Sequence, residues 1–311
     1  MIRFIFLRAL SALGVIVGVS CIVFVLSHVI PGDPVEVMLG EYAAPADREA
    51  LTKRLGLDKP IWEQFVSYMG QLVRFDLGES LHSKRPIVET LAERLPATAW
   101  LAFVSMVIAI VIAVPLGCLA ALKQNSVWDA LAVGFSVFGV AIPNFVFGPL
   151  AILVFAVGLG WFPVSGNETP LAVVLPALTL GTAMAAILAR MVRASLLDVL
   201  REDYVRTARA KGLSDIDVVW RHALRNALLP VVTIVGLQLG ALLAGAVVTE
   251  QVFSWPGIGE LTIESIRRRD YPVLQGCVLV IAITYVIINT LTDVVYAWVD
   301  PRIRLNSDNH S

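Results

Sequence analysis

The sequence predicts an all-α integral membrane protein with six transmembrane helices. Of its 311 residues, 57% are hydrophobic and only 16% are charged, a balance that excludes an ordinary soluble domain. Six long runs contain no Asp, Glu, Lys or Arg. A hydrocarbon core about 30 Å thick takes roughly 20 helical residues, so each run is long enough to span it. The strands of an outer-membrane barrel would be about 10 residues long with strict alternation, which is not the pattern here.

The six predicted spans follow one another from the N-terminal to the C-terminal part of the chain. The third is too long for one straight helix, and Pro143, Pro149 and the stretch 158–160 offer places to bend, so we expect a long or broken helix and then a short external loop. The first continues past Cys21 and therefore predicts an uncleaved span rather than a signal peptide. The spans run from Ala9 to Gly32, Leu95 to Leu122, Ala130 to Asn167, Thr169 to Ala189, Asn226 to Thr249, and Tyr271 to Thr292.

Charge in the short loops predicts the orientation, because loops rich in Lys and Arg stay in the cytoplasm. The basic residues before span one, after spans two and four, and after span six all fall on one side, so we expect both termini to be cytoplasmic. The cluster Arg267–Arg269 would lie outside, beside Glu264 and Asp270. We interpret it as a paired, protein-buried element.

The predicted layout has four parts. Residues 1–30 form the N-terminus and first span, and residues 31–94 form an external segment. Residues 95–300 form a five-helix core that includes a charged cytoplasmic loop, 190–229, and residues 301–311 form a cytoplasmic tail. The external segment contains an amphipathic helix, predicted either to pack on the bundle or to lie at the membrane surface or against a partner. Its apolar residues are Ile61, Phe65, Tyr68, Met69, Leu72 and Phe75.

The interiors of the spans lack ionisable residues, which argues against a stand-alone ion-coupled carrier. Asp129 and Asp293 lie near cytoplasmic ends, where snorkelling or an end-of-helix role is expected. Milder polar residues remain, and each predicts either a hydrogen bond between helices or a side chain lining a water-filled route. The candidates for a translocation pathway are Asn144, Thr182, Gln238 and Asn289.

The chain carries no motif for its own catalysis. It has no GxxxxGK[ST] loop to hold phosphates, no HExxH and no GxSxG turn, which argues against an ATPase site and against an intramembrane hydrolase. The three cysteines lie in apolar runs without CxxC or histidine spacing and are expected to be small buried hydrophobes. We expect no metal site, no cofactor held by this chain and no nucleic-acid partner.

The loop from Arg190 to Arg225 is the most charged part of the chain, with eight basic and five acidic residues. A first helix is predicted over 201–211, with Tyr204 and Ala208 on one face and Gly212 as its left-handed stop. Ser214, with Asp217 three residues later, predicts a capped second helix. That helix carries an apolar stripe of Ile216, Val219, Trp220, Ala223 and Ala227, with Arg221 and Arg225 on another face. The pattern favours a folded docking element over a simple topology anchor.

These motifs resemble those of the membrane permease subunits of bacterial ABC importers, the MetI-like permeases, and specifically the dipeptide and oligopeptide type. Residues 202–213, EDYVRTARAKGL, resemble the peptide-branch form of the EAA loop, and 222–230, HALRNALLP, resemble its continuation. Similar motifs occur at 30–34, 55–60, 253–259 and 268–272. Arg206-Thr207-Ala208 stands where Glu-Ala-Ala is usual in other branches.

The resemblance implies a permease of the bacterial inner membrane that works by alternating access. It implies a second homologous permease, two cytoplasmic ATPase subunits that bind the ATP, and an external solute-binding protein, all in membrane lipid. Solutes of relatives of this kind include dipeptides, longer peptides, glutathione and chelated nickel. The implied ATPase-coupling residues are Glu202, Asp203, Tyr204, Arg206, Thr207, Ala208, Arg209, Ala210, Lys211, Gly212, Leu213 and Arg225.

Overall fold

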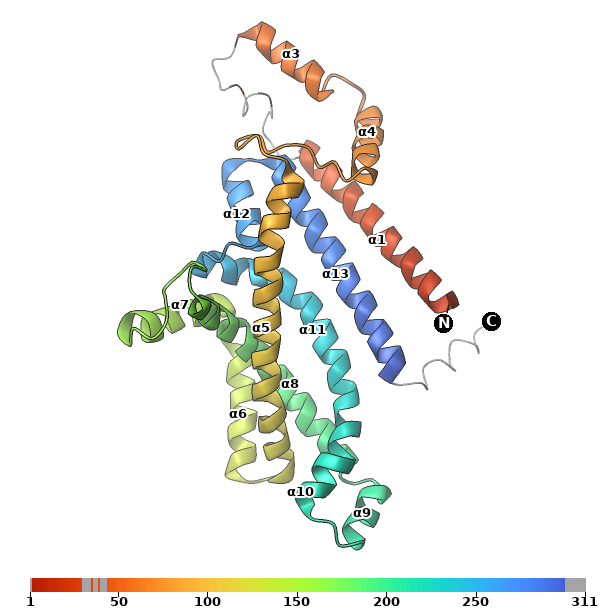
Figure 1. Ribbon diagram of the computed structural model, residues 1–311, viewed down its shortest axis with the longest axis vertical. Helices are drawn as coiled ribbons and strands as arrows, with labels where there is room; N and C mark the ends of the chain where they lie inside the picture. Colours follow the sequence, from red (N-terminus) through yellow and green to blue (C-terminus); the bar gives the residue numbers. More distant parts are fainter. Residues whose placement is uncertain (1, 30–34, 36–38, 40–43, 300–311) are drawn as a thin grey trace. The chain divides into compact units, whose positions relative to one another are not determined.

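The computed structural model describes residues 2–29, 35, 39 and 44–299, and the regular elements of these residues are helical (Figure 1). The one extended pairing among them is an isolated antiparallel bridge between Glu79 and Pro86. The chain forms two compact units, Met1–Thr98 with Pro256–Ile287 and Ala99–Trp255 with Ile288–Ser311. The motif at 30–34 and the predicted tail 301–311 lie outside the described residues.

The helices confirm the predicted all-α membrane fold. Four helical stretches are long and apolar enough to cross a membrane, and a bent pair makes a fifth. A shorter apolar stretch, Leu10–Val25, lies within the 28-residue helix α1 (Ile2–Val29). Five of the six predicted runs thus correspond to helices or a helix pair of spanning length, and the first corresponds to the shorter stretch in α1. The four stretches are α5 (Ile87–Leu122), the 3-10 turn Pro170–Val173 with α8 (Val174–Val199), Val218–Gly240 in the helix that includes α11 (Leu224–Phe253), and the span Tyr271–Val295 within α13 (Tyr271–Val299).

The third span is broken, as the prolines predicted. Helix α6 (Val127–Ala141) ends before Pro143, and α7 (Asn144–Ala151) begins after it and continues as a π-helical segment, Ile152–Gly158. The two halves meet at an angle of 103°. Proline lacks an amide hydrogen and disfavours helix in the residue before it, so the backbone turns here.

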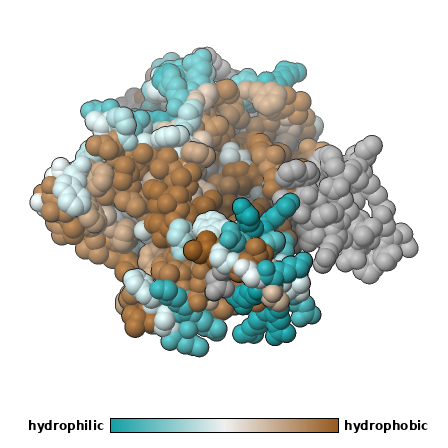
Figure 2. All heavy atoms as spheres, turned by 60° about the horizontal axis from the view of Figure 1, so that its bottom comes forward, coloured by the Kyte–Doolittle hydropathy of each residue, from teal (hydrophilic) through white to brown (hydrophobic). Residues whose placement is uncertain are grey.

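In the larger unit, α8 packs against α5, α6 and α11 through small residues (Figure 1). A Cβ at Gly139 of α6 would lie 2.7 Å from the Cβ of Ala186, and one at Gly181 would lie 2.8 Å from the Ser105 carbonyl oxygen. Small residues let helices approach closely, and this supplies the packing that holds helices together in lipid. The surface is correspondingly apolar, and brown hydrophobic residues cover much of the face shown in Figure 2.

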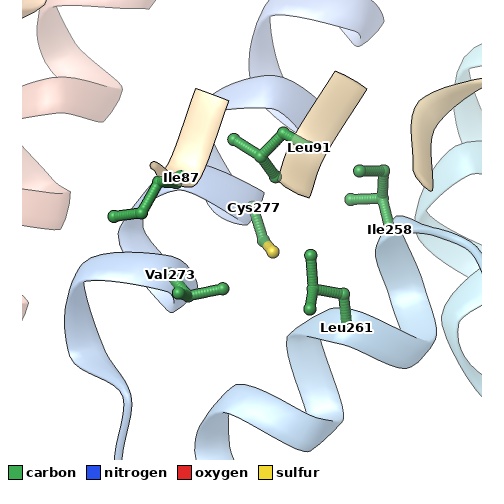
Figure 3. Close-up of a cluster of buried hydrophobic side chains, with 6 residues drawn as sticks. All are labelled: Ile87, Leu91, Ile258, Leu261, Val273 and Cys277. Atoms are coloured by element: carbon green, nitrogen blue, oxygen red, sulfur yellow. The ribbon is translucent and has the colours of Figure 1, made fainter. Parts of the chain in front are cut away.

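In the smaller unit, the N-terminal end of α5 packs against α12 (Ile258–Arg268) and the start of α13 (Figure 3). The cluster is apolar and closed, and the thiol of Cys277 lies inside it as a small hydrophobe, as the sequence predicted. Cys118 is buried too, whereas Cys21 is half-buried. The cluster contains Ile87, Leu91, Ile258, Leu261, Val273 and Cys277.

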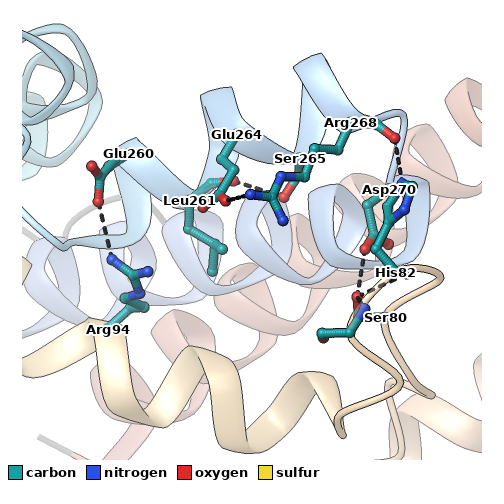
Figure 4. A network of polar contacts seen from close by, with 10 residues as sticks. Ser80, His82, Arg94, Glu260, Leu261, Glu264, Ser265, Arg268 and Asp270 are labelled. Atoms are coloured by element: carbon teal, nitrogen blue, oxygen red, sulfur yellow. Dashed lines mark hydrogen bonds and ion pairs between the residues drawn. The ribbon is translucent and has the colours of Figure 1, made fainter.

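Hydrogen bonds tie the loop before α5 to the turn between α12 and α13 (Figure 4). The Ser80 hydroxyl donates to Asp270 Oδ2 at 2.6 Å, and His82 Nε2 lies 2.6 Å from the Arg268 carbonyl oxygen. Two turns into α5, Arg94 contacts Glu260 at 3.0 Å. Burial nevertheless raises the pKa of Glu260, and Arg94 opposes that rise.

The cluster Arg267–Arg269 is exposed, so the prediction that protein would bury it is wrong. Arg268 does pair with Glu264, at 2.8 Å, but its side chain stays 62% exposed. Arg269 has left-handed backbone dihedrals and ends α12. The arginine side chains at this end of α12 are exposed because the buried face of the helix is formed by Ile258, Leu261 and Ser265.

Candidate coupling loop and polar pathway

The first helix of the charged loop 190–229 is α9 (Asp203–Ala210), and it begins after the extended residue Glu202. Asp203 lies in its first turn and Arg209 in its last, which suits the helix dipole. The Thr207 hydroxyl donates to the Asp203 carbonyl oxygen at 2.9 Å. These local features explain why a short charged segment forms a helix at the predicted position.

The packing of α9 depends on Val205 and Ala208, which are one turn apart and buried against Val218. Tyr204 shares this helix but is 41% exposed. Its hydroxyl accepts a hydrogen bond from the Asn226 side-chain amide at 2.9 Å. Tyr204 and Ala208 share one face of α9, as predicted, but the residues that pack are Val205 and Ala208. Ala208 therefore contributes to the packing of α9 against Val218 of the same loop.

The turn after α9 has the predicted geometry. Gly212 has φ +83°, in the left-handed region that glycine adopts without penalty. The Asp217 N–H donates to the Ser214 hydroxyl at 3.2 Å, and that hydroxyl donates to Asp217 Oδ2 at 2.7 Å. These reciprocal contacts confirm the capping arrangement and fix where the second helix begins.

The apolar stripe predicted for the second helix is only partly correct. Val219, Ala223 and Ala227 are buried, but Ile216 and Trp220 are 72% and 64% exposed. For Trp220 the cause is a π-helical segment, Val218–Ala223, between α10 (Asp215–Asp217) and α11. Its wider turn shifts the face that each side chain occupies, which a 3.6-residue period cannot anticipate.

The outer surface of α9 and the following turn is charged and exposed. A weak contact of 3.7 Å joins Arg206 to Asp203, and both side chains are largely exposed. Arg225 is exposed on the second helix. Mixed charge on a helix whose opposite face is packed is suited to contact with another protein. The exposed members of the predicted set are Glu202, Asp203, Tyr204, Arg206, Thr207, Arg209, Ala210, Lys211, Gly212, Leu213 and Arg225.

An ion pair between α6 and α8 was not predicted. Arg193 Nε and Nη2 lie 2.6 and 2.8 Å from the two carboxylate oxygens of Asp129, and the Asn125 N–H donates to Oδ2 at 3.0 Å. Asp129 is buried in the first turn of α6, so of the two predicted roles the end-of-helix role is confirmed and snorkelling is wrong for this residue. No local signal in the sequence pairs two residues 64 positions apart.

Two of the four pathway candidates line one cavity. Asn144, the first residue of α7, and Thr182 of α8 border a cavity of about 250 Å³ next to the break between α6 and α7. The Thr182 hydroxyl donates to the Leu178 carbonyl oxygen at 2.8 Å within its own helix. The other lining residues are mostly aromatic or small: Phe135, Phe138, Gly139, Ile142, Phe147, Thr179 and Ala183.

Gln238 and Asn289 do not border that cavity. Gln238 lies on α11, and both polar atoms of its amide are shielded without a hydrogen-bond partner among the described residues. Leaving such a group unpaired costs about 1–3 kcal/mol. Asn289 is half-buried on α13. The structure therefore brings together Asn144 and Thr182 and leaves the other two apart from them.

Comparison with known families decides the identity. Residues 113–305 match the family model described as "Binding-protein-dependent transport system inner membrane component". Residues 1–102 match "Binding-prot-dependent transport system membrane comp, N-term". The chain belongs to this family. It is an ABC importer permease component of the inner membrane and not itself an ATPase.

Relatives of this permease match along almost its whole length. The glutathione transport system permease protein GsiC of Escherichia coli O6:H1 strain CFT073 is 44% identical over 304 residues, covering 98% of this chain and 99% of the relative. The GsiC proteins of Escherichia coli K12 and Shigella dysenteriae serotype 1 are 43% identical with the same coverage. The permease is therefore similar to glutathione permeases from end to end.

Solved structures support the fold. Two crystal forms of the MetNI methionine ABC transporter in inward-facing conformations each give a TM-score of 0.57 at 20% and 21% identity. The match covers 68% of this chain and 96% and 97% of the solved chains. At this identity the likeness concerns the fold, which is the MetI-like permease fold.

Proposed function

We propose that this permease translocates small peptides, and glutathione in particular, across a bacterial inner membrane. The observation that carries the proposal is the 43–44% identity to glutathione permeases over 98% of the chain. Glutathione is a tripeptide, so this substrate lies within the peptide class that the sequence motifs imply. The partners proposed are a second homologous permease, two cytoplasmic ATPases that bind ATP, and an external solute-binding protein.

We further propose that α9 and the turn after it form the contact with one ATPase. Val205 and Ala208 hold the helix against Val218, so its charged surface stays outward and in one orientation. A rigid element transmits the closure of the ATPases to the spans, which alternate between inward-open and outward-open states. The termini and this loop would then share the cytoplasmic side.

The cavity bordered by Asn144 and Thr182, together with the shielded amide of Gln238, is our candidate for part of the translocation surface. An apolar cavity with few polar groups is suited to orienting a small solute without binding it tightly. The unpaired Gln238 amide supports this assignment, because a peptide group of a passing solute, or a water molecule that accompanies the solute, would supply the missing hydrogen bonds. Asn289 stays a candidate on the same grounds of polarity within a span.

Reconstituted transport tests the substrate. The permease would be placed in vesicles with its partner subunits, with ATP on the cytoplasmic side and the binding protein outside. Uptake of labelled glutathione, a dipeptide, a pentapeptide and a nickel chelate would be compared. We expect glutathione to accumulate fastest. Uptake of a different solute with none of glutathione would refute the substrate and leave the permease assignment standing.

Charge reversal on α9 tests the coupling contact. We expect Arg206→Glu with Lys211→Glu to reduce co-purification of the ATPase and uptake together. Lys123→Glu is the matched control, because Lys123 is exposed in the turn between α5 and α6, on the same predicted side of the membrane. Full co-purification of the ATPase with the α9 variant would place the contact elsewhere.

A further inference from the structure

Helix α4 (Ile61–Val73) carries two apolar stripes rather than the single one that the sequence predicted. At 100° per residue, Phe65, Tyr68 and Leu72 lie on one face. Trp62, Val66 and Val73 lie on a second face, about a quarter-turn away. The remaining side of the helix is polar and includes Glu63, Ser67 and Gln71.

The first stripe packs on α1. The Phe24 ring lies 5.2 Å from the Phe65 ring in an edge-on arrangement and 5.6 Å from the Tyr68 ring. His28 Nε2 lies 3.1 Å from the Gln64 side-chain oxygen. Burial raises the pKa of Tyr68 to about 12, which agrees with an apolar setting for its phenol. This face of α4 is therefore occupied within the chain, except at its start, where the predicted stripe residue Ile61 is 64% exposed.

The second stripe has no such cover among the described residues. Trp62, Val66 and Val73 are 66%, 62% and 80% exposed. Just after the helix, Phe75 is 83% exposed and has φ +58°. Three large apolar side chains of α4 thus share one uncovered face.

The contact with α1 sets the level of this surface in the membrane. The uncharged run predicted to cross the membrane in α1 extends from Ala9 to Gly32, and α4 contacts α1 at Phe24 and His28, toward the end of that run. The nearby α1 side chains Ile22 and Val25 are themselves 60% and 55% exposed, as expected for residues that face lipid. Helix α4 therefore meets α1 at the boundary between hydrocarbon and head groups.

We propose that α4 is an interfacial helix whose stripe of Trp62, Val66 and Val73 is inserted into the outer leaflet of the membrane. A lipid surface fits better than a protein partner, because α4 packs on a span whose own exposed residues there are apolar, toward the end of that span, where tryptophan is favoured. Helix α4 contains no Lys or Arg, so its binding comes from apolar contact rather than from anionic head groups. The helix anchors the external segment beside the first span.

Site-directed spin labelling of the full chain in lipid vesicles tests this placement. Cys21, Cys118 and Cys277 are replaced by alanine, and one nitroxide is attached at a time to Val66→Cys, Val73→Cys, Ser67→Cys or Gln71→Cys. Collision rates with oxygen, which concentrates in lipid, are compared with those of a water-soluble nickel chelate. We expect an oxygen-to-nickel ratio several-fold higher at positions 66 and 73 than at the matched polar-face positions 67 and 71.

Two results overturn the proposal. Equal access of the nickel chelate at all four positions would mean that the stripe lies in water. Immobilised labels at 66 and 73 that neither reagent reaches would mean that protein covers it. Vesicles without anionic lipid should give the same ratios, since apolar contact is the cause, and a loss of the difference there would contradict that cause.

A second measurement leaves the native cysteines in place. The fluorescence of the chain is compared with that of Trp62→Phe in vesicles whose lipids carry bromine on the acyl chains, which quench tryptophan on contact. We expect the part of the emission that Trp62 contributes to be quenched. Emission from Trp62 that stays unquenched would overturn the insertion even if a labelled variant failed to fold.

Discussion

Replacing Gly212 by valine is the sharpest test of how the coupling loop is shaped. Gly212 follows α9 with φ +83°, and a Cβ built on it would meet no heavy atom within 4 Å. Steric collision with neighbours therefore contributes nothing, and the whole cost arises from the backbone. Valine is β-branched and disfavours the left-handed region by roughly 1–2 kcal/mol or somewhat more.

This free-energy cost is large compared with the energy that holds a short loop in one conformation, and small compared with the packing energy of the spans. A change of 1–2 kcal/mol shifts an equilibrium by a factor of about 5–30, so most molecules with valine would direct α9 away from its native position. The spans are stabilised separately, by packing within the membrane. We expect Gly212→Val to reach the membrane at the normal level and to lose most ATP-driven uptake.

Asparagine is the matched control, because it tolerates left-handed dihedrals better than other residues with a Cβ. Membrane abundance, co-purification of the ATPase and uptake in reconstituted vesicles would be measured for glycine, asparagine and valine at this position. We expect Gly212→Asn to retain most of the uptake. Normal transport by Gly212→Val would refute the reasoning, and equal failure of both variants would show that side-chain bulk, not φ, is the cause.

Three further predictions follow from the layout and the ion pairs. A cysteine at Asp58 should react with an impermeant thiol reagent from outside and one at Asp215 should not; reaction of both from one side would contradict the predicted topology. Replacing Arg267–Arg269 with glutamine should reduce transport without loss of the ATPase from the complex, and unchanged uptake would show that these exposed side chains are only solvated. Asp129→Asn should lower thermal stability in detergent by about 2 kcal/mol, because it leaves Arg193 without its bidentate partner. The exchange Asp129→Arg with Arg193→Asp should recover part of that loss, and its failure to do so would mean that the pair is not the source of the stability.

The sequence alone was sufficient for features that depend on neighbouring residues or on the solvent. Hydrocarbon requires long uncharged helices, so the spans could be predicted from composition and run length. The break at Pro143 and the turn at Gly212 follow from the backbone chemistry of proline and glycine. The capping contact between Ser214 and Asp217 is equally local, since it joins residues three positions apart.

Only the tertiary structure decided the contacts between distant residues. Asp129 and Arg193 lie 64 positions apart, and each has other charged residues nearer in sequence. The cavity shared by Asn144 and Thr182 exists because the bend after α6 places α7 beside α8. The π-helical register at 218–223 moved Trp220 to the surface, and the packing of α12 left Arg267–Arg269 exposed. Local propensity does not determine these outcomes, because side chains far apart in sequence compete for the same positions, and which contact forms depends on how all the helices pack together.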